Sequence, residues 1–142
     1  MEIRELTSDA EILDAFPLMA ELRDRISSET FLGEVRLQEK DGYRLAGAFV
    51  EGRLVALVGY RPGRTLARGP HLFVDDLVTA KRIQGKGFGR AMMRYLGERA
   101  RAAGFPRVYL DSRATAQGFY ERLGLTFLTS IPCWIETEKL LE

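Results

Sequence analysis

The stretch that decides the fold reads HLFVDDLVTAKRIQGKGFGRAMMRYLGERARAAG and spans residues 71–104. Its beginning, 71–79, is a mostly apolar run that predicts a strand. Its end, 88–103, spaces apolar side chains as one face of a helix does, and a glycine follows. A short apolar run at 108–110 predicts the next strand. Together these elements predict a βαβ crossover whose two strands run parallel.

The segment between the first strand and the helix reads QGKGFGR and occupies residues 84–90. Its three glycines permit backbone angles closed to other residues and let a ligand approach the main chain. The N–H groups at a helix start are unpaired, and the helix dipole favours negative charge there. The loop therefore predicts a diphosphate site, with Lys86 and Arg90 adding charged contacts to phosphate oxygens.

Other glycine loops also bind phosphates, and spacing separates them. A P-loop requires glycine where Ala80 stands and Ser or Thr after Lys86, and neither is present. A dinucleotide fingerprint requires a third glycine where Arg90 stands. Asp111 follows the next strand, where a ribose-binding acid belongs, so a dinucleotide-binding oxidoreductase stays an alternative. A glycine-rich turn without a ligand is the other alternative.

The remaining chain predicts elements that add to this unit. Upstream these are a strand at 2–7, a helix capped by Ser8 and Glu11 and kinked at Pro17, a helix opened by Ser27 and Ser28, and a hairpin of 43–50 and 54–60. A loop is expected at 61–70, an amphipathic helix at 116–123 and a last strand region at 125–136. We expect one α/β domain, residues 1–142, with a mixed sheet flanked by helices.

Composition excludes several classes of partner. The 21 Lys and Arg against 20 Asp and Glu give a net charge of +1, so no strong field draws the chain to nucleic acid or membrane. Basic residues still cluster locally, at Arg61, Arg64 and Arg68, and again at Lys81, Arg82, Lys86 and Arg90.

The number of cysteines and the length of the apolar runs indicate the cellular compartment of the protein. The single cysteine, Cys133, allows no internal disulfide and is expected in the core. The N-terminus does not resemble a signal peptide, and no apolar run is long enough to cross a bilayer. We therefore expect a cytoplasmic protein.

Three segments resemble the GNAT superfamily of N-acetyltransferases. Residues 84–89 match its Q/R-x-x-G-x-G/A signature, and 75–79 is similar to its fourth strand. Residues 116–124, AQGFYERLG, resemble its A-x-x-F-Y-x-x-x-G helix. The resemblance covers 71–127. Three residues depart from the family pattern: Arg113, where the family often has Asn, Leu125, which replaces a frequent Phe, and Thr79, which is more polar than usual at the end of its strand.

The resemblance implies a GNAT-like fold with a mixed sheet of six to seven strands, flanked by about four helices and splayed between the fourth and fifth strands. It implies acetyl-CoA as co-substrate, no metal, and direct transfer without a covalent acyl-enzyme. The implied cofactor-binding residues are Leu77, Val78, Thr79, Gln84, Gly85, Lys86, Gly87, Phe88, Gly89, Arg90, Ala116 and Tyr120.

The resemblance also suggests catalytic groups. Tyr120 is the candidate general acid towards the leaving thiolate, since phenols and thiols titrate near ~10 and ~8.5. Asp75 or Asp76 is the candidate base or amine-binding acid, and strand alternation predicts that they face opposite sides of the sheet. A backbone N–H near Val78 would stabilise the oxyanion. Glu34 and His71 are remoter candidates for the base, and His71 is otherwise expected on the surface.

The acceptor is expected to be an amine on a small molecule or a peptide. Tyr43, Tyr60 and Trp134 are candidates to line its pocket. A non-catalytic acyl-CoA-binding module is the alternative of a different class. The 125–138 region offers an edge on which a homodimer can form.

Overall fold

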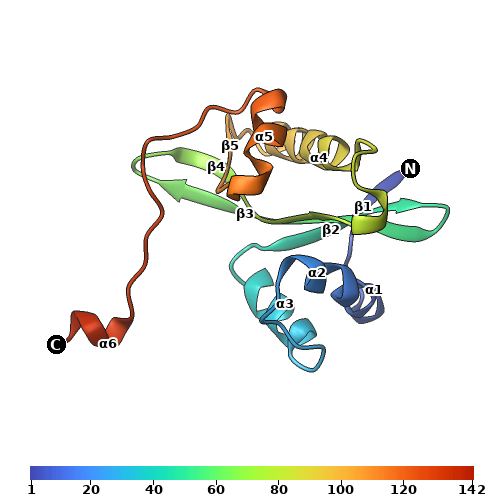
Figure 1. Ribbon diagram of the computed structural model, residues 1–142, viewed down its shortest axis with the longest axis horizontal. Coiled ribbons are helices and arrows are strands. Elements are labelled where there is room, and N and C mark those ends of the chain that lie inside the picture. Colours follow the sequence, from blue (N-terminus) through green and yellow to red (C-terminus); the bar gives the residue numbers. More distant parts are fainter. The chain divides into compact units, whose positions relative to one another are not determined.

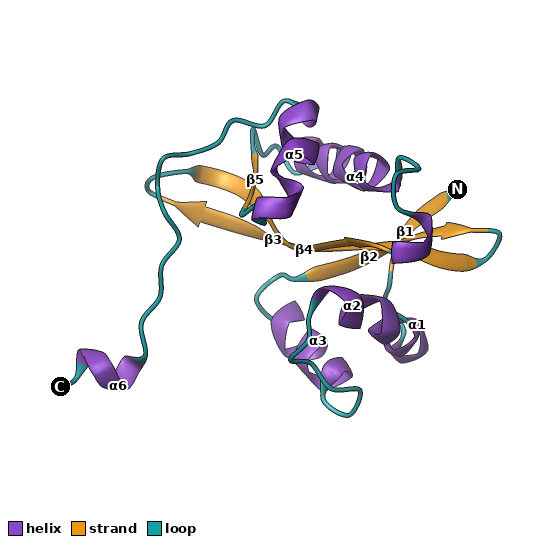
Figure 2. Cartoon of the chain, viewed as in Figure 1, coloured by secondary structure: helices purple, strands orange, loops and turns teal.

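The computed structural model describes all residues, 1–142, as two compact units. Met1–Leu110 holds the β-sheet and helices α1 to α4, and Asp111–Glu142 holds α5 and α6 (Figures 1 and 2).

Three short helices follow the first strand, β1 (Glu2–Glu5): α1 (Asp9–Asp14), α2 (Phe16–Leu22) and α3 (Phe31–Glu39). The expected capping box is present, because the Ser8 Oγ accepts the N–H of Glu11 at 3.1 Å and the Glu11 carboxylate accepts the N–H of Ser8 at 3.4 Å. Pro17 lies in the first turn of α2, so the kink expected there separates two helices.

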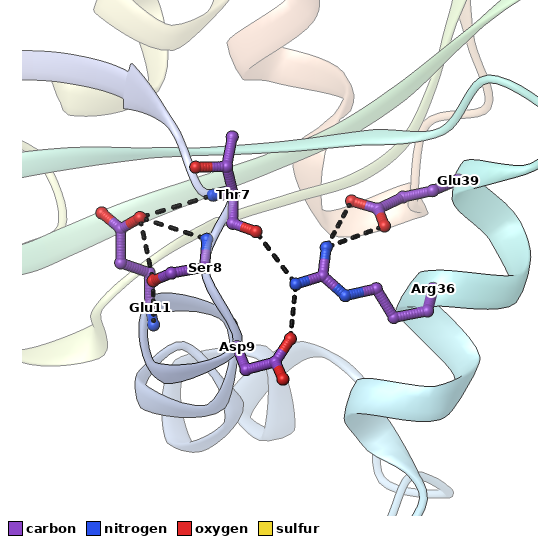
Figure 3. Close-up of polar contacts among 6 residues, drawn as sticks. All are labelled: Thr7, Ser8, Asp9, Glu11, Arg36 and Glu39. Atoms are coloured by element: carbon purple, nitrogen blue, oxygen red, sulfur yellow. Dashed lines mark hydrogen bonds and ion pairs between the residues drawn. The ribbon is translucent and has the colours of Figure 1, made fainter.

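A single arginine joins α3 to the start of α1 (Figure 3). The Arg36 guanidinium donates to the carbonyl oxygen of Thr7 at 2.9 Å, to Asp9 Oδ1 at 2.6 Å and to Glu39 Oε1 at 2.9 Å. Asp9 also places negative charge in the first turn of α1, where the helix dipole favours it. These contacts hold the helical layer together at its edge.

The sheet has five strands in the order β1-β2-β3-β4-β5. The later strands are β2 (Arg44–Val50), β3 (Arg53–Thr65), β4 (Gly69–Thr79) and β5 (Val108–Leu110). The first three pairings are antiparallel, and β4 pairs with β5 in parallel through the crossover helix α4 (Phe88–Ala102). The predicted mixed α/β fold is confirmed, with five strands instead of six to seven and six helices instead of about four.

The sheet separates two apolar clusters. Helices α1 to α3 cover one face, where Ile12, Phe31 and Leu57 are buried. Helix α4 covers the other face, where Met92 and Leu96 pack on the strands. The side chains of β2 and β3 alternate between these clusters, so both faces of the central strands are apolar.

The expected loop at 61–70 is wrong, because β3 continues to Thr65 and β4 begins at Gly69. Residues 61–65 of β3 pair with residues 69–73 of β4, from Arg61↔Phe73 to Thr65↔Gly69. This pairing keeps both segments extended, although Pro62 and Gly63 are unfavourable in a strand. His71 is buried, with 3% of its surface exposed, and is not on the surface as expected. Gly63 lies opposite it, and a Cβ there would come within 2.5 Å of the His71 Nε2.

The second unit contains a 3₁₀ turn (Ala114–Ala116), α5 (Gln117–Leu123) and α6 (Thr137–Leu140). Helix α5 ends at Gly124 with φ +91°, as its sequence predicted. The strand expected at 125–136 is absent, and Cys133 is exposed, not part of the core. An apolar pattern makes a strand only where a partner strand satisfies its N–H and C=O groups, and Pro132 removes one N–H.

No helix combines the length and the apolar character needed to cross a bilayer.

The ladder between β3 and β4 contains one irregularity, at which β4 has one extra residue. Gly59 pairs with Asp76 and Tyr60 pairs with Val74, so Asp75 has no partner on β3 and forms a β-bulge. Gly59 is buried at this point, and a Cβ on it would overlap the hydroxyl of Tyr43 and come within 2.7 Å of the Asp76 carboxylate. Glycine is therefore required opposite the bulge for reasons of space.

We predict that Gly59→Ala lowers the free energy of unfolding by about 1–3 kcal/mol, because the methyl group displaces two hydrogen-bonded side chains. Gly97→Ala is the control: Gly97 is exposed inside α4 with open space around it, and alanine there should stabilise by about 0.5–1 kcal/mol. Urea unfolding measures both changes. An unchanged midpoint for Gly59→Ala would contradict the prediction.

Candidate functional site

The edge of β4 is open over half of its length. Strand β5 pairs only with Leu72, Phe73 and Val74, so residues 75–79 pair with β3 alone. On the side towards β5, alternate N–H and C=O groups of 75–79 have no strand partner. The expected splay between the fourth and fifth strands is therefore present, and it begins at the bulge.

The glycine loop follows β4 after a 3₁₀ turn, Lys81–Ile83. Gly85 has φ +86° and Gly87 has φ +84°, which is the left-handed region that favours glycine. Their added Cβ atoms would meet nothing within 4 Å, so backbone conformation and not space requires them. Gly89 lies inside α4 with ordinary helical φ. The Gln84 side-chain amide donates to the carbonyl oxygen of Thr79 at 3.3 Å and ties the loop to the strand end.

The start of α4 is open and positively charged. Gly87 caps the helix without a side-chain hydrogen bond, so the first N–H groups of α4 lack an acceptor. Lys86 and Arg90 are exposed, and neither forms an ion pair. Unpaired amides, the helix dipole and two exposed cations are the groups that bind a diphosphate. These residues therefore fit the diphosphate of CoA.

Both predicted carboxylates lie beside the splay, and their surroundings differ. Both oxygens of Asp76 are bonded: Oδ1 accepts from Arg23 Nε at 3.0 Å, and Oδ2 accepts from the Tyr43 hydroxyl at 2.8 Å. The Asp75 Oδ2 accepts from Arg61 Nε at 2.9 Å, while its Oδ1 has no bonded partner. Asp76 is thus held on two sides, and Asp75 keeps one oxygen free.

The prediction that Asp75 and Asp76 face opposite sides of the sheet is wrong. Asp76 bonds to Arg23 and Tyr43 on the face that α1 to α3 cover. Asp75 bonds to Arg61, which lies over Phe73, and Phe73 points away from the α4 cluster that holds Leu72 and Val74, so Asp75 lies on that same face. The bulge breaks the alternation, because its extra residue is unpaired and turns towards the same face as its neighbour. The two carboxylates consequently act on each other electrostatically.

Burial and charge shift the pKa values of this group. Burial raises the pKa of Asp75 above its ordinary value, and the bond from Arg61 opposes that rise. Burial, with the charge of Asp76, raises the pKa of Tyr43 far above its ordinary value. Tyr43 therefore stays protonated and donates its hydrogen bond to Asp76 at neutral pH.

Tyr120 and Ala116 belong to the second unit. The Tyr120 ring is buried and forms a T-shaped pair with Phe119, with 5.0 Å between the ring centroids, and its hydroxyl makes no hydrogen bond. Burial raises the pKa of Tyr120. Ala116 ends the 3₁₀ turn that leads into α5.

The remaining candidates are dispersed. Glu34 is exposed on α3, and His71 bonds through Nδ1 to the carbonyl oxygen of Gly69 at 2.8 Å. Tyr43 and Tyr60 are buried in opposite clusters, and Trp134 is exposed. They do not form a common lining.

Sequence reasoning missed the two arginines that hold the carboxylates. Arg23 lies 52 residues before Asp75 and follows the last turn of a helix, and no local pattern marks such a contact. The sequence does show Arg61 as part of a basic cluster with Arg64 and Arg68. Its pairing with Asp75 depends on the extended hairpin, which the sequence did not predict.

Comparisons with known proteins agree on one family. The model of the acetyltransferase (GNAT) family matches residues 4–125. A Bacillus subtilis (strain 168) protein named uncharacterized N-acetyltransferase YhdJ is 33% identical over 131 residues, covering 89% of this chain and 92% of that protein.

Two solved structures share the fold. An acetyltransferase of Trypanosoma brucei has a TM-score of 0.80 at 22% identity, covering 95% of this chain and 99% of that one. The aminoglycoside N-acetyltransferase AAC(6')-Iy in complex with CoA has a TM-score of 0.83 at 12% identity, covering 96% and 94%. By sequence, and with the fold in agreement, this chain belongs to the GNAT family of N-acetyltransferases and is an acyltransferase.

Proposed function

We propose that the chain transfers an acetyl group from acetyl-CoA directly to an amine on a small molecule or a peptide. The observation that carries this proposal is the open edge of β4 leading into a loop with two left-handed glycines at a helix start. The sheet contains a single parallel pair, whereas a dinucleotide-binding oxidoreductase is built from several parallel strands. That geometry favours CoA over a nicotinamide cofactor.

The proposed binding mode uses main-chain groups along the strand and the loop. The pantetheine arm would bond to the free edge at Leu77, Val78 and Thr79, as an added strand does. The diphosphate would accept hydrogen bonds from the amides at the start of α4. The full set of proposed contacts is Leu77, Val78, Thr79, Gln84, Gly85, Lys86, Gly87, Phe88, Gly89, Arg90, Ala116 and Tyr120.

Asp75 is the better candidate for the base. A proton acceptor needs a free lone pair, and the Asp75 Oδ1 has one, whereas both oxygens of Asp76 are bonded. The raised pKa of Asp75 also makes it a stronger base than an ordinary aspartate. Asp76 then acts as a positioning residue that fixes the bulge between Arg23 and Tyr43. A main-chain N–H near Val78 remains the proposed oxyanion donor.

Tyr120 is proposed as the general acid, on the resemblance of residues 116–124 to the family's helix. Its raised pKa keeps the phenol protonated at neutral pH, which a proton donor requires. Acetyl-CoA supplies the acetyl group, and no metal is proposed, since no cluster of metal-ligating side chains occurs in the structure.

Residues of the second unit support two further proposals, a cytoplasmic location and a homodimer. An exposed free Cys133 suits the reducing cytoplasm. The segment after α5 exposes the apolar side chains of Ile131, Trp134 and Ile135, which lie in the 125–138 region proposed as the edge of a homodimer. We propose that residues 1–142 form one domain, which a single cooperative unfolding transition of the whole chain would test. Light scattering would test the homodimer.

We predict that Gly87→Ala weakens acetyl-CoA binding at least tenfold, because alanine is strained at φ +84° and moves the amides of α4. Gly52→Ala is the matched control, since Gly52 has φ +77°, equally open surroundings and a place in the β2–β3 turn. Calorimetric titration with acetyl-CoA measures both variants. Equal affinities in the two variants would contradict the proposed diphosphate site.

We predict that Asp75→Asn lowers kcat by about 10²–10⁴-fold and removes the acidic limb of the kcat/KM profile. In the unmodified enzyme that limb rises with pH as Asp75 loses its proton, and it lies above the ordinary aspartate pKa of about 3.9. Asp76→Asn should keep the limb and lower the melting temperature instead. A limb that vanishes only in Asp76→Asn would reverse the two roles.

We predict that Tyr120→Phe lowers kcat while the affinity for CoA changes little, because the ring is kept and only the proton is lost. Release of free thiol in the presence of an amine panel measures the rate, and thermal-shift titration with CoA measures the affinity. Binding of acetyl-CoA by the unmodified chain without transfer to any amine would favour the non-catalytic alternative. A Tyr120→Phe variant with full turnover would remove Tyr120 as the acid.

A further inference from the structure

The outer half of the β3–β4 hairpin and β5 form a surface of stacked arginine and aromatic side chains. The hairpin extends past helices α1 to α3 (Figure 1). We call Arg61, Arg68, Arg107, Phe73 and Tyr109 the arginine surface. Arg61 pairs with Phe73 across β3 and β4, and Phe73 pairs with Tyr109 across β4 and β5, so these side chains share one face of the sheet.

The three guanidinium groups follow one another along this face. Arg61 lies 5.0 Å from the centre of the Phe73 ring, and Arg68 lies 5.9 Å from the same ring. Arg68 also lies 4.4 Å from the Tyr109 ring, whose hydroxyl accepts from Arg107 at 3.1 Å. Stacking on a ring face leaves the N–H groups at the guanidinium edge free to bind an anion.

Two of the three positive charges of this surface have no carboxylate partner. The one carboxylate bonded to it is Asp75, through Arg61. Neither Arg68 nor Arg107 forms an ion pair. Arg68 is only partly exposed and rests on two rings, so little side-chain entropy is lost when it binds a ligand. A preorganised cation without a partner is suited to bind a carboxylate.

The place of the surface restricts the ligand. It begins at Asp75, the proposed base. The proposed pantetheine contacts begin at Leu77, four strand residues from Phe73, which is at most roughly 13 Å at 3.3 Å per residue. The α-carboxylate of a free amino acid lies too close to its amine to span that length. An extended peptide spans it in about four residues.

We propose that the arginine surface binds the carboxylate side chains of an acidic peptide whose N-terminal amine receives the acetyl group. This inference rests on the proposed function and adds the substrate class. At one end the free Oδ1 of Asp75 receives the cationic amine, and at the other Arg68 and Arg107 hold the acidic side chains. Arg61 lies between them and is already neutralised by Asp75.

The test compares two peptides that differ only in charge, Ala-Ala-Asp-Asp-Asp-Gly and Ala-Ala-Asn-Asn-Asn-Gly. We expect the acidic peptide to have a KM at least tenfold lower, and this preference to shrink as salt is raised. Arg68→Gln and Arg107→Gln should raise the KM of the acidic peptide about tenfold at unchanged kcat, and leave the neutral peptide unaffected. Arg68→Lys should restore part of the loss.

Arg53→Gln is the matched control, because Arg53 is exposed at the far end of β3 and forms no ion pair. Fluorescence anisotropy of labelled peptides measures binding independently of transfer. Arg68-dependent binding of the acidic peptide without acetylation would support the surface and overturn the proposed function. Equal KM and equal binding for both peptides, or tighter binding of an oligonucleotide of equal charge, would overturn the inference.

Discussion

One unpaired residue in β4 sets the geometry on which the site depends. Asp75 is extra relative to β3, and β5 stops pairing with β4 at Val74, directly before it. A bulge bends its strand and increases the local twist, so β4 diverges from β5 from this residue onwards. The open edge of β4 and the placement of two adjacent carboxylates on one face are therefore consequences of the same irregularity.

The bulge is held by the helical layer. Arg23 at the end of α2 and Tyr43 before β2 both bond to Asp76, and Gly59 leaves the space that these side chains occupy. Removing one partner of a buried carboxylate typically costs about 1–3 kcal/mol or more, because the group is then left unsatisfied. The Asp76 carboxylate thus joins β4 to Arg23 after α2 and to Tyr43 before β2. A shift of the helices at this point would move the strand edge as well.

The sequence predicted features whose cause is local. The glycines at 85 and 87, the capping box of Ser8 and Glu11, and the helix stop at Gly124 each depend on backbone angles or on groups a few residues apart. The bulge was not predictable, because it depends on the register between two strands and on Arg23. The extended arms around Pro62 and the buried position of His71 depend on cross-strand partners too. The 125–136 segment has the apolar pattern of a strand but no partner strand, so the prediction made from that pattern was wrong.

A net charge of +1 hides three separate electrostatic regions along β4. Lys86 and Arg90 flank the open start of α4 beyond one end of the strand, and Arg68 and Arg107 lie at the other end. Asp75 and Asp76 lie between them. Charges of both signs at this spacing cancel at long range but not within a Debye length of about 8 Å, so a bound molecule meets each region separately. This order of regions favours a ligand set with three charged groups: a diphosphate, a cationic amine and a distant carboxylate. The net charge therefore argues against general attraction to polyanions, but it does not indicate which acceptor binds.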